Sequence, residues 1–184
     1  PVEHIPSKSS IVKSEKPTVC FLGRMDPQKR YWLFFELAKA FPEVKFIAVG
    51  GPSLLYEGLY KRVIRRYQEL ENLKILGFVN EEAKSRVLSR SWILVLPSIR
   101  EGLPIAFLEG LAHQCALLSS VNPDNLTEKY GYWAKKDDFA EGLRYLLEGD
   151  RWRRLSGEGY RYVKENHNME TIISLLVRLL ENAV

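Results

Sequence analysis

The chain has 184 residues, of which 46% are hydrophobic and 27% are charged, and its formal net charge is +4 at pH 7. This length fits one domain or one lobe of a two-lobe protein, and the composition is that of a globular domain with a true core. No signal peptide is visible and no apolar run is long enough to cross a membrane, so we expect a cytoplasmic protein. Cys20 and Cys115 lie in apolar runs, which favours buried thiols over a disulfide or half a metal site.

Residues 1–16 are rich in Pro, Ser and Lys, and we expect a linker or an incomplete element there. One domain is then expected over residues 17–184. Short apolar runs predict six strands within it, at residues 18–22, 44–49, 73–76, 92–96, 115–119 and 131–134. Helices are expected at residues 33–41, 54–70, 81 onward and 104–113, then at 137–147, 150–165 and 169–182, and a polar loop is expected at 121–129. Asn80 can cap the helix that begins at residue 81.

Strands that alternate with helices at this spacing predict a parallel sheet covered on both faces. With right-handed crossovers, the fold class is α/β, a Rossmann-like doubly wound sheet of about six strands. Ligands bind such sheets at the carboxyl ends of the strands. The loops that follow the predicted strands are therefore the first places to look for a site.

The loop after the first strand contains Gly23, Arg24 and Lys29. Glycine permits a sharp turn, and an arginine fork with a lysine point charge suits a diphosphate. Taken alone, the loop fits a solvated surface pair better than a binding site. It contains neither the G-x-G-x-x-G pattern of dinucleotide sites nor the G-x-x-x-x-G-K-[ST] pattern of nucleoside triphosphatases.

The loop after the fourth strand runs from Ser98 to a second glutamate, Glu109. Glu101 and Gly102 lie in the loop, and Pro104 marks the start of the predicted helix. Free N–H groups at a helix start form a natural anion site, although a proline donates none. Glu109 lies among apolar neighbours, so its carboxylate needs a partner.

These residues resemble a known family, the group-one retaining glycosyltransferases of GT-B fold. The resemblance rests on four motifs, each in a loop after a predicted strand or opening the next helix, namely Gly23-Arg24 with Lys29, Gly50-Gly51-Pro52, Gly77-Phe78-Val79, and Pro97-Ser98-x-x-Glu101-Gly102 with Glu109. It covers the chain from Thr18 onward and points to the C-terminal, nucleotide-sugar-binding lobe. The family often has glycine where this chain has Pro104, so one backbone donor is lost.

The resemblance implies a role for each matched residue. Arg24 and Lys29 would act in catalysis by holding the donor diphosphate and stabilising the departing nucleotide, and Glu101 would face the donor sugar. Glu109 would bind the ribose hydroxyls, and the backbone near Val79 would meet the base edge. The other residues implied to bind the nucleotide sugar are Gly23, Gly50, Gly51, Gly102, Leu103, Pro104, Ile105 and Ala106.

The implied reaction is transfer of a sugar from a UDP-, GDP- or ADP-sugar to an acceptor, with retention at the anomeric carbon. No metal and no other cofactor is expected, and no Asp-x-Asp motif is present. The N-terminal, acceptor-binding lobe of the family is missing from this chain. Alone, the chain would therefore bind the donor but transfer little or nothing.

Other interpretations stay open. A GT-B relative with other chemistry, such as a sugar-nucleotide epimerase, would share the same motifs. The basic stretch with Lys61, Arg62, Arg65 and Arg66 could bind nucleic acid, but it lacks an aromatic stacking platform, and a solvated basic face fits better. The same residues could contact anionic lipid at a membrane, as in peripheral glycosyltransferases with lipid acceptors.

Overall fold

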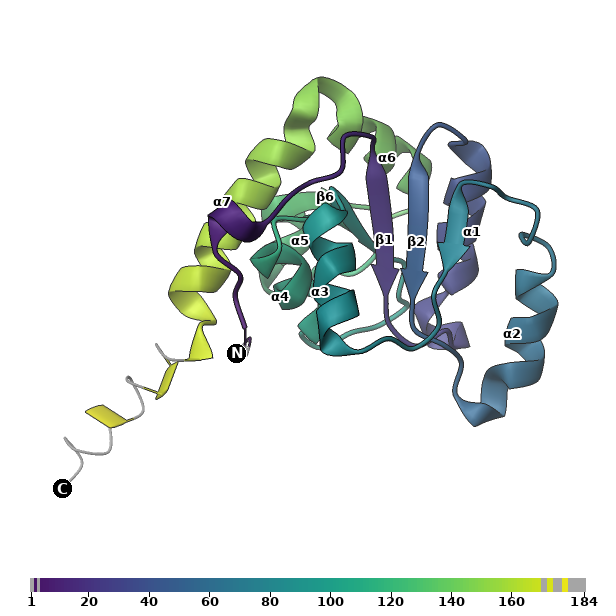
Figure 1. Ribbon diagram of the computed structural model, residues 1–184, viewed down its shortest axis with the longest axis horizontal. Coiled ribbons are helices and arrows are strands. Elements are labelled where there is room, and N and C mark those ends of the chain that lie inside the picture. The colour runs from purple at the N-terminus through teal and green to yellow at the C-terminus, as the bar shows by residue number, and fades with distance from the viewer. Residues whose placement is uncertain (1, 3, 170–171, 174–176, 179–184) are drawn as a thin grey trace.

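Six strands form one parallel sheet in the computed structural model, which describes residues 2, 4–169, 172–173 and 177–178. The strand order is β3-β2-β1-β4-β5-β6, and Figure 1 shows the first strands of this sheet with helices around them. The strands are β1 (Thr18–Leu22), β2 (Lys45–Val49), β3 (Leu73–Ile75), β4 (Ile93–Leu96), β5 (Ala116–Ser119) and β6 (Gly131–Trp133). The predicted fold class and the six predicted strands are confirmed.

Helices cover both faces of the sheet. The α-helices are α1 (Tyr31–Ala40), α2 (Glu57–Ile64), α3 (Glu81–Arg90), α4 (Ile105–Ala112), α5 (Leu126–Tyr130), α6 (Phe139–Leu147) and α7 (Arg151–Asn166). Short 3-10 turns, which include η2 (Pro27–Lys29) and η3 (Leu54–Tyr56), precede some of them. Helices α1 and α6 pack against each other, and α4 packs against α7. Among the described residues, no helix has the length and apolarity needed to span a bilayer.

The core lies at the middle of the sheet. Strand β1 pairs with β2 from Thr18 opposite Lys45 to Leu22 opposite Val49, and it pairs with β4 on its other side. All residues of β4 and β5 are buried, as expected for a parallel sheet with both faces covered. Phe34 of α1 packs on Phe46 of β2 with ring centroids 5.2 Å apart. Cys20 and Cys115 are buried free thiols, as predicted.

Two element predictions were wrong. Residues 121–129 are not a continuous polar loop, because α5 begins at Leu126, which is buried. The side chain of Asn122 accepts a hydrogen bond from the Glu128 N–H at 3.1 Å and helps to hold this helix start. The helix expected over residues 54–70 is only η3 and α2 and ends at Ile64. The final predicted helix, residues 169–182, lies mostly outside the described residues.

The N-terminal segment packs against the domain. The ammonium of Lys13 donates hydrogen bonds to the carbonyls of Ser91 and His113, the latter at 2.7 Å, and so joins the ends of α3 and α4. Burial lowers the pKa of Lys13, while Cys115 and Cys20 oppose that shift. Tyr160 of α7 donates to the Pro6 carbonyl at 2.9 Å. These contacts hold the segment along the α3 and α7 side of the sheet.

Gly50 brings the ends of β1 and β2 close together. Its φ is +119°, and a Cβ there would lie 2.0 Å from the Gly23 carbonyl oxygen. The N–H of Gly50 donates to the Gly77 carbonyl at 2.8 Å, which links the loop after β2 to the loop after β3. Only glycine fits both the conformation and the space.

We therefore predict that Gly50→Ala lowers the free energy of unfolding by about 1–3 kcal/mol, because it adds backbone strain and a clash with backbone. Gly157→Ala is the matched control, since a Cβ there meets nothing within 4 Å and the residue lies inside α7. That variant should be more stable by up to about 1 kcal/mol. Urea unfolding of both variants measures this, and equal stabilities would contradict it.

Candidate functional site

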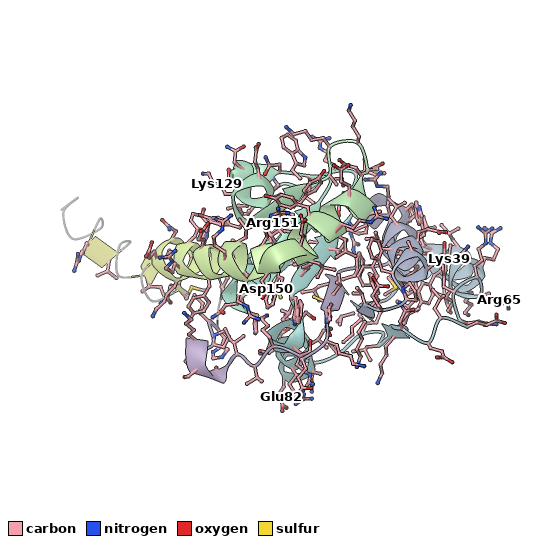
Figure 2. All side chains as sticks on the ribbon, turned by 90° about the horizontal axis from the view of Figure 1, so that it is seen from above. Lys39, Arg65, Glu82, Lys129, Asp150 and Arg151 are labelled. Atoms are coloured by element: carbon pink, nitrogen blue, oxygen red, sulfur yellow. The ribbon has the colours of Figure 1, made fainter. Side chains whose placement is uncertain are left out.

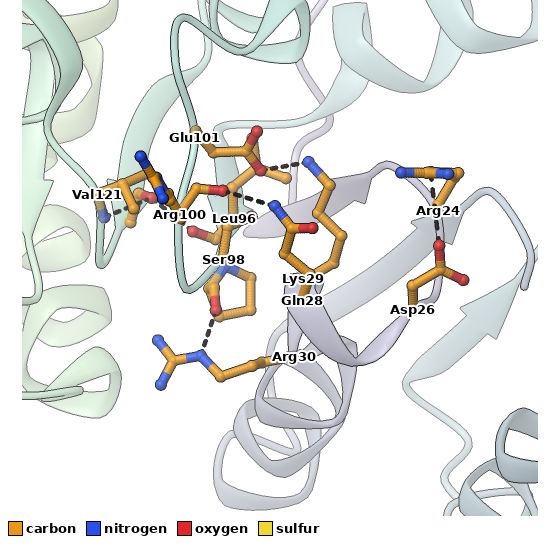
Figure 3. Close-up of polar contacts among 12 residues, drawn as sticks. Arg24, Asp26, Gln28, Lys29, Arg30, Leu96, Ser98, Arg100, Glu101 and Val121 are labelled. Carbon is orange, nitrogen blue, oxygen red and sulfur yellow. Dashed lines mark hydrogen bonds and ion pairs between the residues drawn. The ribbon is translucent and has the colours of Figure 1, made fainter. Parts of the chain in front are cut away.

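The loops after β1 and β4 meet at the carboxyl edge of the sheet. These strands are neighbours, and the chain leaves β1 towards the β2 side and β4 towards the β5 side. Such a reversal of strand order is where open α/β sheets bind ligands. The predicted diphosphate loop and the Glu101 loop are thus brought side by side, as Figure 3 shows.

The loop after β1 is held by its own acid. Asp26 is buried, and its carboxylate accepts hydrogen bonds from the Ser53 N–H at 3.0 Å and the Ser53 hydroxyl at 3.1 Å. The Met25 N–H donates to the Gly51 carbonyl at 2.9 Å. Arg24 Nε lies 3.5 Å from Asp26 Oδ2, but 66% of the Arg24 side chain is exposed. Asp26 therefore holds the Nε end of this guanidinium, while most of the Arg24 side chain is open to solvent.

Lys29 and Glu101 form an ion pair between the two loops (Figure 3). Their side chains are only 18% and 12% exposed. Beside them, the Gln28 amide donates to the Arg100 carbonyl at 3.1 Å, and the Ile99 N–H donates to the Gln28 carbonyl at 2.9 Å. The pair is thus part of a continuous polar seam that fixes one loop against the other.

Arg30 extends this seam to two further loops. Its Nε donates to the Pro97 carbonyl at 2.7 Å, and one terminal nitrogen donates to the Ser120 hydroxyl at 3.0 Å. The two terminal nitrogens also form a bidentate pair with Asp137, at 2.7 and 2.8 Å. Arg30 has left-handed backbone dihedrals, with φ at 44° and ψ at 40°. Its position is therefore set by these contacts more than by its own conformational preference.

The start of α4 offers backbone donors. Pro104 is the N-cap of this helix. Its carbonyl accepts a hydrogen bond from the Phe107 N–H at 2.9 Å. The N–H groups of Ile105 and Ala106 lie in the first turn, where a helix leaves donors without intrahelical partners. A Cβ at Gly102 would meet nothing within 4 Å. The protein itself does not require glycine there, so space remains for a ligand.

On the other side of α4 lies an open cavity of about 840 Å³, lined by α3, α4 and the N-terminal segment. Glu109 projects into it and pairs with Lys84 of α3, with Nζ 2.6 Å from Oε1. The sequence predicted that the Glu109 carboxylate needs a partner, and Lys84 is that partner. Ile105 also lines the cavity, so the N-terminal turn of α4 borders it.

His113 lies at the far wall of the cavity. Its Nε2 is 2.8 Å from the Ser85 hydroxyl, and its Nδ1 is 2.8 Å from the Glu109 carbonyl oxygen. Because that carbonyl can only accept, Nδ1 carries a proton and Nε2 accepts from Ser85. Burial lowers the pKa of His113, and the nearby charges of Lys13, His4 and Lys84 lower it further, although the bond to Glu109 opposes them.

The structure thus groups the predicted residues in two places. Lys29 and Glu101 form one pair, and Arg24 lies in the same β1 loop as Lys29 but pairs with Asp26, whereas Glu109 lies in the α3–α4 cavity. Gly50 lies against the Gly23 carbonyl, and the Gly51 carbonyl accepts from the Met25 N–H, so both glycines contact the β1 loop. Val79 precedes Asn80, whose side chain caps α3 by accepting from the Ala83 N–H at 2.9 Å, as predicted.

Sequence reasoning missed three side chains that complete these groups: Asp26, Arg30 and Lys84. Asp26 carried a local signal, since it lies in the loop with Arg24 and a buried acid beside a cation is a common loop anchor. The partners of Arg30 lie 67–107 residues away along the chain, and Glu109, the partner of Lys84 in the cavity, lies 25 residues from it. No spacing pattern in the sequence marks such contacts.

Residues 5–166 match a protein-family model described as "Glycosyl transferases group 1". A curated relative from Escherichia coli, "UDP-Gal:alpha-D-GlcNAc-diphosphoundecaprenol alpha-1,3-galactosyltransferase", is 33% identical over 119 residues, which are 59% of this chain and 29% of that protein. "Glycosyltransferase 1 domain-containing protein 1" from Xenopus tropicalis is 26% identical over 159 residues, 83% of this chain and 46% of that one. The chain spans less than half the length of either relative.

Solved structures share the fold. A point mutant of Staphylococcus aureus TarM, crystallised in complex with fondaparinux, alpha-GlcNAc-glycerol and UDP, aligns with a TM-score of 0.77 at 20% identity, covering 96% of this chain and 37% of TarM. Anabaena HepE in complex with UDP and glucose aligns with a TM-score of 0.73 at 14% identity, covering 90% of this chain and 48% of HepE. At these identities the likeness establishes the fold alone.

The pH dependence of the unfolding free energy tests the buried position of His113 in the cavity wall. Because folding lowers its pKa, the unfolded chain binds a proton there more readily than the folded protein does. The unfolding free energy should therefore be highest above the ordinary histidine pKa of about 6.5 and fall as the pH drops below it. Urea unfolding across this range measures the slope. His113→Gln should flatten it, and an unchanged slope in that variant would contradict the assignment.

Proposed function

The chain belongs to the glycosyl transferases of group 1, and we propose that it forms the lobe that binds the nucleotide-sugar donor. One observation carries the proposal. A paired cationic and acidic cluster and an open cavity of about 840 Å³, large enough to admit a nucleoside, flank the same helix start, at the switch point of the sheet. A nucleotide sugar has three parts in a row, and this arrangement offers a place for each.

The nucleoside is assigned to the α3–α4 cavity, with the ribose hydroxyls on Glu109 and the base near the backbone of Val79. The diphosphate is assigned to Arg24, Lys29 and the free N–H groups at the start of α4, since cations and helix N-termini both suit phosphate. The sugar then lies near Glu101 and the open space at Gly102. Glu101 is an acceptor for sugar hydroxyls and is held in place by Lys29.

In the proposed reaction, the bond between the anomeric carbon and the diphosphate oxygen breaks, and an acceptor hydroxyl oxygen bonds to that carbon with retention. Its proton leaves with the diphosphate or with solvent. Negative charge grows on the departing diphosphate, and Arg24 and Lys29 meet it with fixed positive charge. This is the electrostatic contribution that most lowers such barriers, and we propose that it operates here without a metal ion.

UDP is the nucleotide we propose first. The Escherichia coli relative is named for a UDP-galactose donor, and the TarM and HepE structures are titled as complexes with UDP. GDP- and ADP-sugars are the alternatives. Because the chain spans less than half of its curated relatives, we propose that a second lobe supplies most of the acceptor site and that transfer requires both.

Binding of nucleotides tests the donor site. Arg24→Ala should weaken UDP binding by about tenfold or more, because it removes a charge-assisted contact to phosphate. Glu109→Gln should weaken UDP but have less effect on inorganic diphosphate, which has no ribose. Titration calorimetry on the complete protein measures both affinities.

Arg154→Gln is the matched control. Arg154 is 63% exposed and pairs with Glu158 on α7, outside both the diphosphate cluster and the lining of the α3–α4 cavity, so its loss should leave the affinity for UDP within about twofold. If neither UDP, GDP nor ADP binds the wild-type protein, the proposal fails. If the complete protein converts a nucleotide sugar into an epimer without an acceptor, the lobe belongs to an epimerase instead.

We also propose that the protein works at a membrane surface on a lipid-linked acceptor. The name of the Escherichia coli relative gives a GlcNAc-diphosphoundecaprenol as the acceptor of that protein. Leu54 and Leu55 on η3 are 93% and 81% exposed. Next to them, α2 and the turn after it present exposed cations, while Tyr60, Val63 and Ile64 pack against the core. The cations are Lys61, Arg62, Arg65 and Arg66, and Figure 2 shows Arg65 at the edge of the molecule.

Vesicle sedimentation tests the membrane proposal. Vesicles of phosphatidylglycerol and phosphatidylcholine in equal parts should retain the complete protein at low salt and release it as salt rises. Arg62→Gln combined with Arg65→Gln should weaken binding about thirtyfold, at roughly 1 kcal/mol per cation near an anionic surface. Lys39→Gln on α1, also exposed, is the control and should bind as wild type. Equal binding by all three proteins would contradict the assignment of this surface.

A further inference from the structure

Lys84 lines the α3–α4 cavity, and the donor site proposed above gives it no role. Its Nζ lies 2.6 Å from Glu109 Oε1 and 2.6 Å from Glu81 Oε2. The side chain of Lys84 is 17% exposed and that of Glu109 is 19%, whereas that of Glu81 is 88%. The bond to Glu109 is therefore the sheltered one, and the bond to Glu81 faces water.

The electrostatics of the pair follow from this burial. Burial works to lower the pKa of Lys84, but the hydrogen bonds and charges of Glu109 and Glu81 outweigh it and raise that pKa. Lys84 therefore remains a cation at neutral pH. A cation at hydrogen-bond distance offsets the cost of burying the Glu109 carboxylate. Glu109 follows Phe107 and Leu108 on a largely buried helix, so without Lys84 its carboxylate would lie beside apolar groups with no cation.

The geometry also leaves part of Glu109 available. Lys84 bonds to Oε1, and within the described part of the chain no hydrogen bond to Oε2 is present. A carboxylate held by one oxygen keeps a fixed orientation and offers the other oxygen as an acceptor. Such preorganisation reduces the side-chain ordering that a ligand must otherwise impose.

We propose that Lys84 is a positioning residue for nucleotide recognition, which pairs with Glu109 and orients it so that Glu109 discriminates in favour of a ligand with ribose hydroxyls. This inference rests on the proposed function, in which Glu109 meets the ribose. Lys84 acts through Glu109. Its loss should therefore affect the selectivity for ribose hydroxyls more than the affinity for the diphosphate.

Two ligands isolate this effect. UDP carries both ribose hydroxyls, and 2′,3′-dideoxy-UDP carries neither, while their bases and diphosphates are identical. The wild-type protein should prefer UDP by about tenfold or more, since hydrogen bonds to a charged group are among the strong ones. In Lys84→Met the preference should fall to about twofold or less. Calorimetry with both ligands on the complete protein gives the ratio for each variant.

Three further variants guard the interpretation. Lys84→Gln keeps an N–H donor and tests the role of charge if the methionine variant does not fold. It should retain an intermediate preference. Arg154→Gln and Glu158→Gln each break the ion pair between these two residues on α7, which do not line the α3–α4 cavity. Both should keep the wild-type preference, because neither touches the cavity or the bond between Lys84 and Glu109.

The outcomes separate this inference from the proposed function. If the wild-type protein binds no nucleotide, the proposed function fails. If it binds UDP and 2′,3′-dideoxy-UDP equally, the donor lobe stands but Glu109 does not recognise the ribose, and the role of Lys84 is overturned. If the wild type prefers UDP and the Lys84 variants keep the same preference, the inference alone is overturned. A reduced preference with unchanged binding of 2′,3′-dideoxy-UDP supports it.

Discussion

The contacts of the Arg30 guanidinium are the constraint on which the site depends. They join the loop after β1 to the loops after β4, β5 and β6, through Pro97, Ser120 and Asp137. The Arg30 side chain is 18% exposed, and its fork meets the Asp137 carboxylate in the bidentate geometry that favours such pairs. Since Arg30 follows Lys29 directly, the position of the Lys29 ammonium beside Glu101 is tied to the same anchor.

Each functional cation of the site is accompanied by an acid. Arg24 has Asp26, Lys29 has Glu101, and Lys84 has Glu109. Such pairing limits the cost of placing partly buried charges there. In the proposed donor site, a diphosphate would therefore meet two cations, Arg24 and Lys29, whose charges are already balanced by acids. Selectivity for the whole donor would then depend on geometry, that is, on whether sugar, diphosphate and ribose reach their partners together.

The sequence predicted those features that depend on residues close together along the chain. Apolar runs of four to six residues predicted all six strands, and the residue types at Asn80 and Pro104 marked the starts of α3 and α4. The polar composition of residues 121–129 hid α5, because that short helix is held by tertiary burial of Leu126 and by the Asn122 side chain. The glycine and charge motifs indicated the loops of the site. They could not indicate the partners of Lys84 and Arg30, which depend on how distant segments pack.

Pro104 shows how a departure from the family pattern can fit the same site. As the N-cap of α4 it supplies its carbonyl to the Phe107 N–H and has no donor of its own. The donors at the helix start are then those of Leu103 before the proline and of Ile105 and Ala106 after it. The proline also fixes φ at this position, so the loop from Glu101 is directed into α4 with less conformational freedom than a glycine would allow. The start of α4 thus has one backbone donor fewer than a glycine would give it, and the Glu101 loop approaches that helix with a more restricted backbone.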